Sequence, residues 1–169
     1  PMSIMVGVGR GAEVGVLIKN AEALERMEKV DTLVVDKTGT LTEVRPSVVA
    51  IEVAEGFEEN DLLRIAASLE RSSEHPLAAA IVKAAEDRAL ALVEPSGVDQ
   101  PVGKGIVGVV DDKAIVLGNA NFLEEYDVDL GALAEAADRL RADGATAIYI
   151  AVNGKAAGVI AIADPVKET

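Results

Sequence analysis

The chain has 169 residues, 50% of them hydrophobic and only 2% aromatic, so its core must be built from aliphatic side chains. The formal net charge of -13 argues against binding to nucleic acid or to an anionic membrane through bulk charge. No cysteine is present, which excludes disulfides, cysteine metal sites and thiol catalysis. The length suits one ordinary domain or two small ones.

The first 30 residues show no membrane span and no secretory leader. No run approaches the roughly 20 consecutive apolar residues of a membrane helix, and a basic leader with a cleavage site is absent. Residues 1–20 are rich in glycine, but no strand precedes them, so a phosphate-binding glycine loop is not predicted. Further along, Ala21, Leu24 and Met27 recur at helical spacing and predict a helix over residues 20–30.

Residues 32–42 contain the densest concentration of reactive groups. The apolar run 32–35 predicts a short buried strand of a parallel sheet, and the sequence Asp-Lys-Thr-Gly-Thr-Leu-Thr follows at 36–42. Open α/β sheets place their chemistry at the carboxyl ends of such strands. The Asp36 carboxylate could therefore attack a phosphoryl group and become an aspartyl phosphate, with Lys37 and a bound Mg²⁺ offsetting the charge.

A second region begins after a break at Glu43-Val44-Arg45-Pro46, which we interpret as a hinge. Residues 47–53 alternate in character and predict a strand. Asn60 is a plausible N-cap for a helix through residue 69. Its inward positions are predicted to be Leu62, Leu63, Ala66 and Leu69.

The next helix is predicted to start at Pro76 and to run to about residue 88, which places His75 at its beginning. A neutral imidazole offers a donor, an acceptor and a flat face, all of which suit a purine. A simple capping role is the competing interpretation. Glu70 ends the preceding helix, where an ordinary surface glutamate is one interpretation of it.

Residues 89–93 predict a strand that Pro95-Ser96-Gly97 interrupts. Residues 103–108 match G-x-G-x-x-G, but the segments 106–110 and 113–117 predict a β-hairpin rather than the strand and helix of a dinucleotide site. Gly103 and Gly105 would still let a ligand approach the backbone.

The remaining elements are two helices and a hairpin. Asn119 is predicted to cap a short helix through residue 125, and a longer helix covers 130–141. Strands 146–152 and 155–162 are predicted to be joined by a type I′ turn at Asn153-Gly154.

The motifs together resemble one protein family. The sequence DKTGTLT at 36–42 resembles the phosphorylation loop of the P-type ATPases, within the haloacid dehalogenase-like superfamily. The sequence SEHPL at 73–77 resembles the nucleotide-domain signature of heavy-metal P-type ATPases, and PMSIMVG at the start is similar to copper-transporting members. The resemblance implies that ATP phosphorylates Asp36 and that the carbonyl of Thr38 contacts Mg²⁺. Related phosphatases carry a general acid/base aspartate where Thr38 stands, so a lasting phosphoenzyme is expected.

The resemblance also implies an α/β fold. An α+β nucleotide-binding domain at 46–162, an antiparallel sheet flanked by helices, is expected within an incomplete haloacid dehalogenase-like phosphorylation domain. Residues 1–45 would form the first part of that domain, and residues 163–169 would lead back into it. The implied nucleotide-binding residues are Glu70, His75, Gly103, Gly105, Gly118 and Asn119. The resemblance implies that His75 orients ATP near the adenine and that the Glu70 carboxylate accepts from the exocyclic amine of adenine, which discriminates against guanine.

The expected function is that of the ATP-binding and phosphoryl-acceptor part of a Cu⁺-translocating P-type ATPase, a soluble cytoplasmic portion of a membrane pump. Its cofactors would be ATP and Mg²⁺, with Asp36 and Thr38 as a partial metal site, and its partners the remaining pump domains. The isolated piece is expected to bind ATP without turnover. Residues 1–45 are expected to be disordered, repacked or self-associated, because their strand lacks neighbours. The alternatives are a non-catalytic nucleotide-binding or regulatory module and a soluble phosphatase of the same superfamily.

Overall fold

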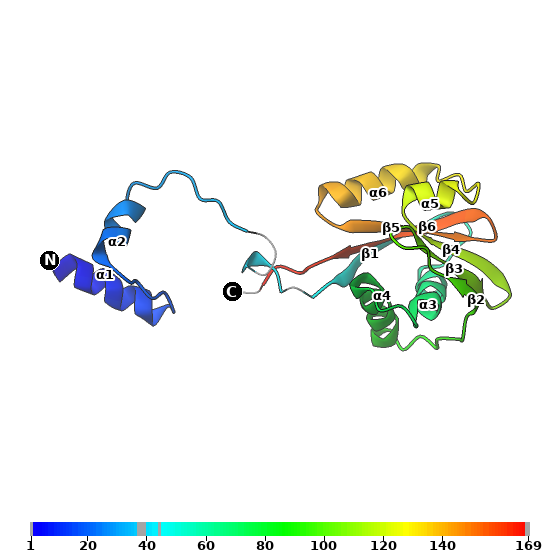
Figure 1. Ribbon diagram of the computed structural model, residues 1–169, viewed down its shortest axis with the longest axis horizontal. Coiled ribbons are helices and arrows are strands. Elements are labelled where there is room, and N and C mark those ends of the chain that lie inside the picture. Colours follow the sequence, from blue (N-terminus) through cyan, green and yellow to red (C-terminus); the bar gives the residue numbers. More distant parts are fainter. Residues whose placement is uncertain (1, 37–39, 44, 168–169) are drawn as a thin grey trace. The chain divides into compact units, whose positions relative to one another are not determined.

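The computed structural model describes residues 2–36, 40–43 and 45–167 and divides into two compact units, Pro1–Asp36 and Lys37–Thr169 (Figure 1). The domain boundaries inferred from the sequence, at residues 45 and 162, stay a prediction. None of the helices among the described residues is long and apolar enough to cross a bilayer.

The first unit contains two helices. Helix α1 spans Met2–Glu13, and α2 spans Ala21–Met27. The side chain of Asn20 caps α2 by accepting a 2.9 Å hydrogen bond from the backbone N–H of Ala23. The predicted helix over 20–30 is therefore confirmed in its first part, whereas the glycines of α1 gave no helical signal.

The predicted strand at residues 32–35 is wrong. These residues form no strand, and the Leu33 and Val34 side chains are 79% and 92% exposed. A strand requires a neighbour to accept and donate its ladder hydrogen bonds, and no other described segment pairs with this one. The apolar run is thus extended but unpaired.

The second unit is built on a six-stranded sheet in the order β1-β6-β5-β4-β3-β2. Every neighbouring pair is antiparallel. The strands are β1 (Ser47–Val53), β2 (Ser96–Asp99), β3 (Gly105–Val110), β4 (Lys113–Gly118), β5 (Thr146–Val152) and β6 (Lys155–Ala163). The expected antiparallel sheet flanked by helices is confirmed.

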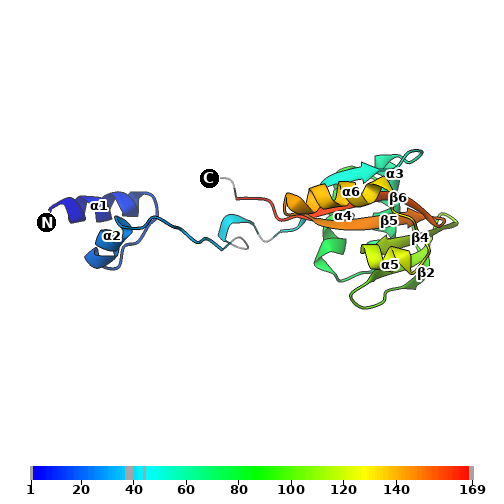
Figure 2. The same cartoon turned by 90° about the horizontal axis from the view of Figure 1, so that it is seen from above.

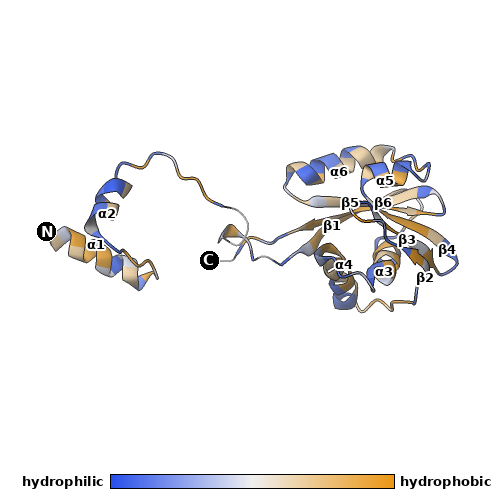
Figure 3. Cartoon of the chain, in the orientation of Figure 1, coloured by the Kyte–Doolittle hydropathy of each residue, from blue (hydrophilic) through white to orange (hydrophobic). Residues whose placement is uncertain are grey.

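Two pairs of helices cover the two faces of this sheet (Figures 1 and 2). Helices α3 (Glu59–Glu70) and α4 (Pro76–Asp87) lie on one face, and α5 (Ala120–Glu124) and α6 (Ala132–Ala142) lie on the other. Strands β5 and β6 are buried almost without interruption because both of their faces are covered. Figure 3 shows the resulting concentration of hydrophobic residues on the strands.

Both predicted hairpins are confirmed. Asp111 and Asp112 turn β3 into β4 with φ angles of 51° and 60°, and Asn153 and Gly154 turn β5 into β6 with φ angles of 50° and 76°. Two successive left-handed residues are typical of a type I′ turn. The Asn153 side chain also accepts a 2.9 Å hydrogen bond from the N–H of Ala114, which ties the second turn to β4.

The chain enters and leaves this unit side by side. Thr42 and Val166 form an isolated antiparallel bridge, and the N–H of Lys167 donates to the Leu41 carbonyl at 2.8 Å. The N–H of Glu43 donates to the Pro165 carbonyl at 3.0 Å. The segment that leads into β1 and the segment that follows β6 are therefore paired with each other next to the sheet.

Three details of the predicted elements need correction. Residues 89–93 are not a strand, because the N–H of Val93 donates to the Ser68 hydroxyl at 3.1 Å rather than to a ladder partner. Strand β2 begins at Ser96, inside the segment predicted to interrupt a strand. Asn60 is not an N-cap, because α3 begins one residue earlier and Asn60 Oδ1 accepts from the Arg88 guanidinium at 2.8 Å.

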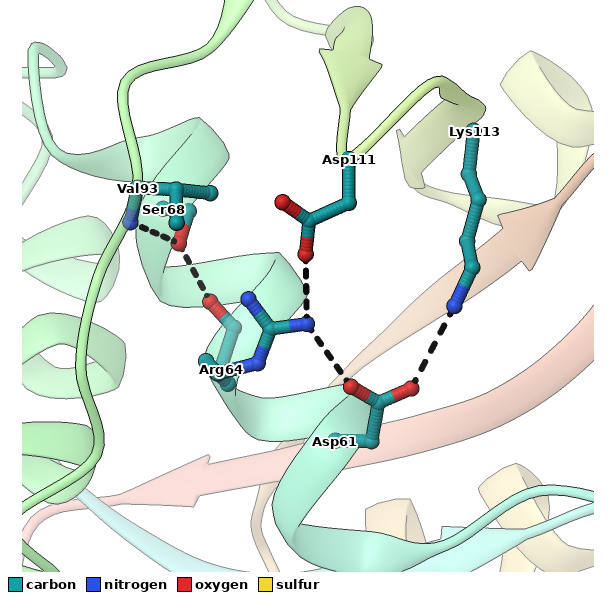
Figure 4. A network of polar contacts seen from close by, with 6 residues as sticks. All are labelled: Asp61, Arg64, Ser68, Val93, Asp111 and Lys113. Carbon is teal, nitrogen blue, oxygen red and sulfur yellow. Dashed lines mark hydrogen bonds and ion pairs between the residues drawn. The ribbon is translucent and has the colours of Figure 1, made fainter.

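A polar network fixes the first half of α3 to the β3–β4 turn (Figure 4). The Arg64 guanidinium lies 2.8 Å from Asp61 and 2.7 Å from Asp111, and the Lys113 ammonium lies 3.6 Å from Asp61. The hydrogen bond from Arg64 holds the pKa of the Asp61 carboxyl below its ordinary value of 3.8, against a smaller opposing effect of burial. One arginine thus connects a helix to a turn that carries two left-handed residues.

We expect Arg64→Met to lower the free energy of unfolding by about 1–2 kcal/mol, because two carboxylates lose their shared partner. The control is Lys83→Met, which removes an exposed pair with Asp87 and should stay within about 0.5 kcal/mol of wild type. Urea unfolding measures both values. Since the pKa of Asp61 is lowered, the advantage of wild type should be present above pH 3.8 and should shrink as the pH falls below it. A constant difference at all pH values would contradict this account.

Gly158 marks a close approach between β6, β1 and α3. A Cβ at this position would lie 2.5 Å from the Glu52 carbonyl oxygen and 2.5 Å from Leu62 Cδ2. Gly158→Ala should therefore destabilise the second unit by about 1–3 kcal/mol in thermal or urea unfolding. The control is Gly9→Ala in the first unit, where a Cβ would have no atom within 4 Å. It should leave the unfolding transition of the second unit unchanged.

Candidate functional site

A cavity of about 630 Å³ opens at the end of α3. Its walls come from the α3–α4 connection, the segment 100–105, the end of β4 and the start of β5. The structure brings every predicted nucleotide-binding residue to this cavity: Glu70, His75, Gly103, Gly105, Gly118 and Asn119. Their role in binding stays a prediction.

Glu70 is the last residue of α3 and is only 7% exposed. Its Oε2 atom is buried and has no hydrogen-bond partner. Burial raises the pKa of this carboxyl above its ordinary value of 4.5, while a hydrogen bond with the Ser73 side chain and the proximity of His75 oppose the rise. A buried acceptor without a hydrogen bond lowers the stability of the fold, and a ligand in the cavity that donates a hydrogen bond to it would remove this cost.

His75 caps α4, as the simpler interpretation of the sequence expected. Its Nδ1 accepts a 3.2 Å hydrogen bond from the N–H of Leu77. An accepting Nδ1 carries no proton, so the neutral imidazole carries its proton on Nε2. Because the side chain is exposed and also lines the cavity, capping leaves Nε2–H and the ring face available to a ligand.

Ser73 and Gln100 line the cavity but were not singled out from the sequence. The Ser73 hydroxyl accepts from Gln100 Nε2 at 3.0 Å and from the His75 N–H at 3.4 Å. Ser73 therefore joins the α3–α4 connection to the segment that follows β2. Its place within SEHPL was a usable signal, whereas nothing in the sequence marked Gln100.

The glycines of the site have two different roles. Gly105 and Gly118 are paired across β3 and β4, and a Cβ at Gly118 would lie 2.6 Å from the Lys104 carbonyl oxygen and 2.7 Å from Phe122 Cδ1. A Cβ at Gly105 would likewise collide with the Leu117 carbonyl oxygen. These two residues are glycine because the strands and α5 pack tightly, not only because a ligand would approach. Gly103 instead adopts a φ of 75° in open space.

Asn119 closes this part of the wall. Its Oδ1 accepts from the Phe122 N–H at 2.9 Å and so caps α5, as predicted. Its amide Nδ2 donates to the Gly103 carbonyl at 3.4 Å. The ammonium group of Lys104, the residue after Gly103, donates to the two carboxylate oxygens of Glu125 at 2.7 and 2.9 Å. The only strong positive charge of this segment is thus already paired.

The other half of the predicted chemistry is in the segment 36–42. Asp36 is exposed and belongs to the first unit, whereas Lys37, Thr38 and Gly39 lie outside the described residues. Within the described ranges no group of three or more acidic, histidine or cysteine side chains is placed to hold a metal ion. The described residues therefore do not by themselves fit a Mg²⁺ site.

Comparison with known proteins identifies the family. Residues 30–169 match the family model described as haloacid dehalogenase-like hydrolase. A copper-exporting P-type ATPase of Legionella pneumophila is 53% identical over all of this chain, which spans 23% of that protein.

Two solved structures agree with the fold. A zinc-transporting PIB-type ATPase in an E2·Pi state superposes with a TM-score of 0.76 at 34% identity, covering 97% of this chain and 26% of its own. The N-domain of a copper-transporting P-type ATPase superposes with a TM-score of 0.61 at 26% identity, covering 70% of this chain and 99% of its own.

These matches confirm the resemblance that the motifs suggested. The chain spans less than a quarter of the length of the Legionella protein. The chain belongs to the haloacid dehalogenase-like hydrolase family, and along its whole length it is similar to P-type ATPases.

Proposed function

We propose that this chain is the ATP-binding and phosphoryl-acceptor part of a Cu⁺-translocating P-type ATPase. The observation that supports the proposal most is the cavity at the end of α3, where an unpartnered glutamate and an accessible histidine face the same space. The apolar side chains of Leu77, Val102 and Ile148 line it as well, and they suit a flat base.

Each predicted nucleotide-binding residue has a distinct part in the proposed binding. Glu70 contacts the amine edge of adenine, and the His75 ring packs against the base with its Nε2–H free to donate. Gly103 lets the nucleotide approach the backbone, while the Gly105–Gly118 pair lets β3, β4 and α5 pack closely beside the cavity. Asn119 holds the Gly103 carbonyl and α5 in place. Base recognition therefore takes place entirely within the second unit.

Phosphoryl transfer would follow at Asp36. A carboxylate oxygen of Asp36 attacks the γ-phosphorus in line, the bond to the bridging oxygen breaks, and its electron pair leaves with ADP. Thr38 has no pKa near neutrality and cannot activate water, so the acyl phosphate persists. Magnesium is expected of this family, and Asp36 and the Thr38 carbonyl are its proposed ligands. Because the described residues do not complete that site, no step here depends on the metal.

The ion proposed is Cu⁺. Relatives named as copper-exporting and silver-exporting are 53% and 52% identical along the whole chain, whereas the zinc-transporting structure is 34% identical. Identity thus favours copper or silver over zinc, and the similarity of residues 1–7 to copper-transporting members favours copper. The segment proposed here would be exposed to the cytosol, and its partners would be the actuator, membrane and remaining phosphorylation domains of the pump.

We expect His75→Ala to weaken ATP binding to this chain by roughly tenfold or more, because stacking on an aromatic ring contributes about 1–3 kcal/mol per base. His75→Asn is the matched variant, since asparagine retains an N-cap acceptor but not the ring. Calorimetric titration should find a lower affinity for ATP in both variants. Thermal unfolding should show a loss of stability in the alanine variant alone. Equal affinity of wild type and His75→Asn would contradict the ligand role.

Asp36 is tested in the intact pump. Terminally labelled ATP should produce an acid-stable, hydroxylamine-sensitive phosphoenzyme in wild type, and Asp36→Asn should abolish it because an amide is a poor nucleophile. Asp31→Asn, five residues earlier on the same segment, is the control and should retain labelling. Labelling that survives Asp36→Asn would assign the phosphate elsewhere. The isolated chain should bind ATP without measurable turnover.

A further inference from the structure

We propose that Glu70 recognises the nucleotide as a neutral carboxylic acid, which donates its O–H to N1 of adenine and accepts from the exocyclic amine. The inference rests on the proposed ATP-binding function and adds the protonation state in which the site works. It makes binding a proton-coupled step.

The position of Glu70 disfavours the carboxylate. Its Oε2 is buried without a partner, and the residues before it on α3, from Ile65 to Leu69, are all buried. A charged oxygen left unpaired in such surroundings is far more costly than a neutral one. Glu70 is also the last residue of a helix of 12 residues. The negative ends of the backbone carbonyl dipoles lie at this end of the helix and disfavour an anion there.

The charges around Glu70 do not reverse this. Strand β3 and the first turn of α4, both packed near α3, contain no ionisable side chain. Glu74, His75 and Lys104 line the same cavity, while Glu52 of β1 lines a different one. Lys104 is paired with Glu125 and Arg71 with Glu94, while the Ser73 hydrogen bond and the proximity of His75 oppose the effect of burial on the pKa of Glu70 without outweighing it. Burial is the largest influence on the pKa of Glu70, and it raises that pKa.

The chemistry of the base edges matches a neutral acid. Adenine presents an acceptor at N1 beside a donor at its exocyclic amine, and a carboxylic acid offers the complementary donor and acceptor. A carboxylate is acceptor-only, so one oxygen would face the N1 lone pair. The two N–H groups on the guanine edge would suit a carboxylate better. The neutral form of Glu70 thus favours adenine over guanine, and ionisation weakens that preference.

The sign of the pH dependence follows. Below the pKa of Glu70 in the free protein, the proton is already present and this group adds no pH dependence to the affinity. Above that pKa, binding must take up a proton, and the affinity for ATP falls by up to about tenfold per pH unit. Because burial raises this pKa, the fall begins at a higher pH than the ordinary value of 4.5 would give.

The experiment is calorimetric titration of ATP into the 169-residue chain in buffers of different ionisation enthalpy, from about pH 5 to pH 8. Wild type is expected to take up protons, with an affinity that falls as pH rises. Glu70→Gln is expected to lose that uptake, because its amide donates and accepts at every pH, and its affinity relative to wild type should rise with pH. Glu74→Gln removes an exposed carboxylate from the same cavity and should keep the proton uptake of wild type.

A second measurement does not depend on the folding of a variant. An ATP analogue with C–H in place of N1 should bind wild type at least roughly tenfold more weakly than ATP, since the acid loses its acceptor. Equal proton uptake in wild type and Glu70→Gln, or equal affinity for the two nucleotides, would overturn this inference and leave ATP binding standing. No binding of ATP at any pH would overturn the proposed function itself.

Discussion

Strands β4, β5 and β6 of the second unit are buried on both faces along most of their length, and this constraint decides where polar groups can lie. Among the described residues only Thr42, Ser68 and Glu70 are buried polar or charged side chains. Ser68 is satisfied, since its hydroxyl donates to the Arg64 carbonyl at 2.7 Å and accepts from Val93. Glu70 keeps one buried oxygen without a partner. The proposed site lies where the packing leaves the Glu70 carboxyl incomplete beside a cavity.

Helix α3 connects the stability of this unit to its binding site. Near its start, Arg64 holds Asp61 and the β3–β4 turn together, and its last residue is Glu70. Between these ends the buried face of the helix packs on the sheet within one core cluster. Because strands β3 and β4 also supply the glycine floor of the cavity, the helix and the hairpin that shape the site are fixed to each other by the Arg64 network.

The two chemical roles proposed for the chain fall on separate compact units. Base recognition belongs to the second unit, whereas Asp36 is the last residue of the first. The paired connections at Thr42 and Val166 join the sheet to the rest of the chain at one place. Such a double connection suits the proposed role, in which a domain presents a nucleotide to an acceptor carried elsewhere.

The sequence by itself determined the local elements and the family. Apolar spacing predicted the inward face of α3, Asn119 and Asn153-Gly154 predicted a cap and a turn, and DKTGTLT with SEHPL pointed to the P-type ATPases. These features depend on neighbours along the chain. Only the tertiary structure decided the rest, since residues 32–35 lack a ladder partner and residues 89–93 satisfy their backbone through Ser68. It also decided that Gly105 and Gly118 face Phe122 and that Glu70 is buried, because both depend on segments far apart in sequence.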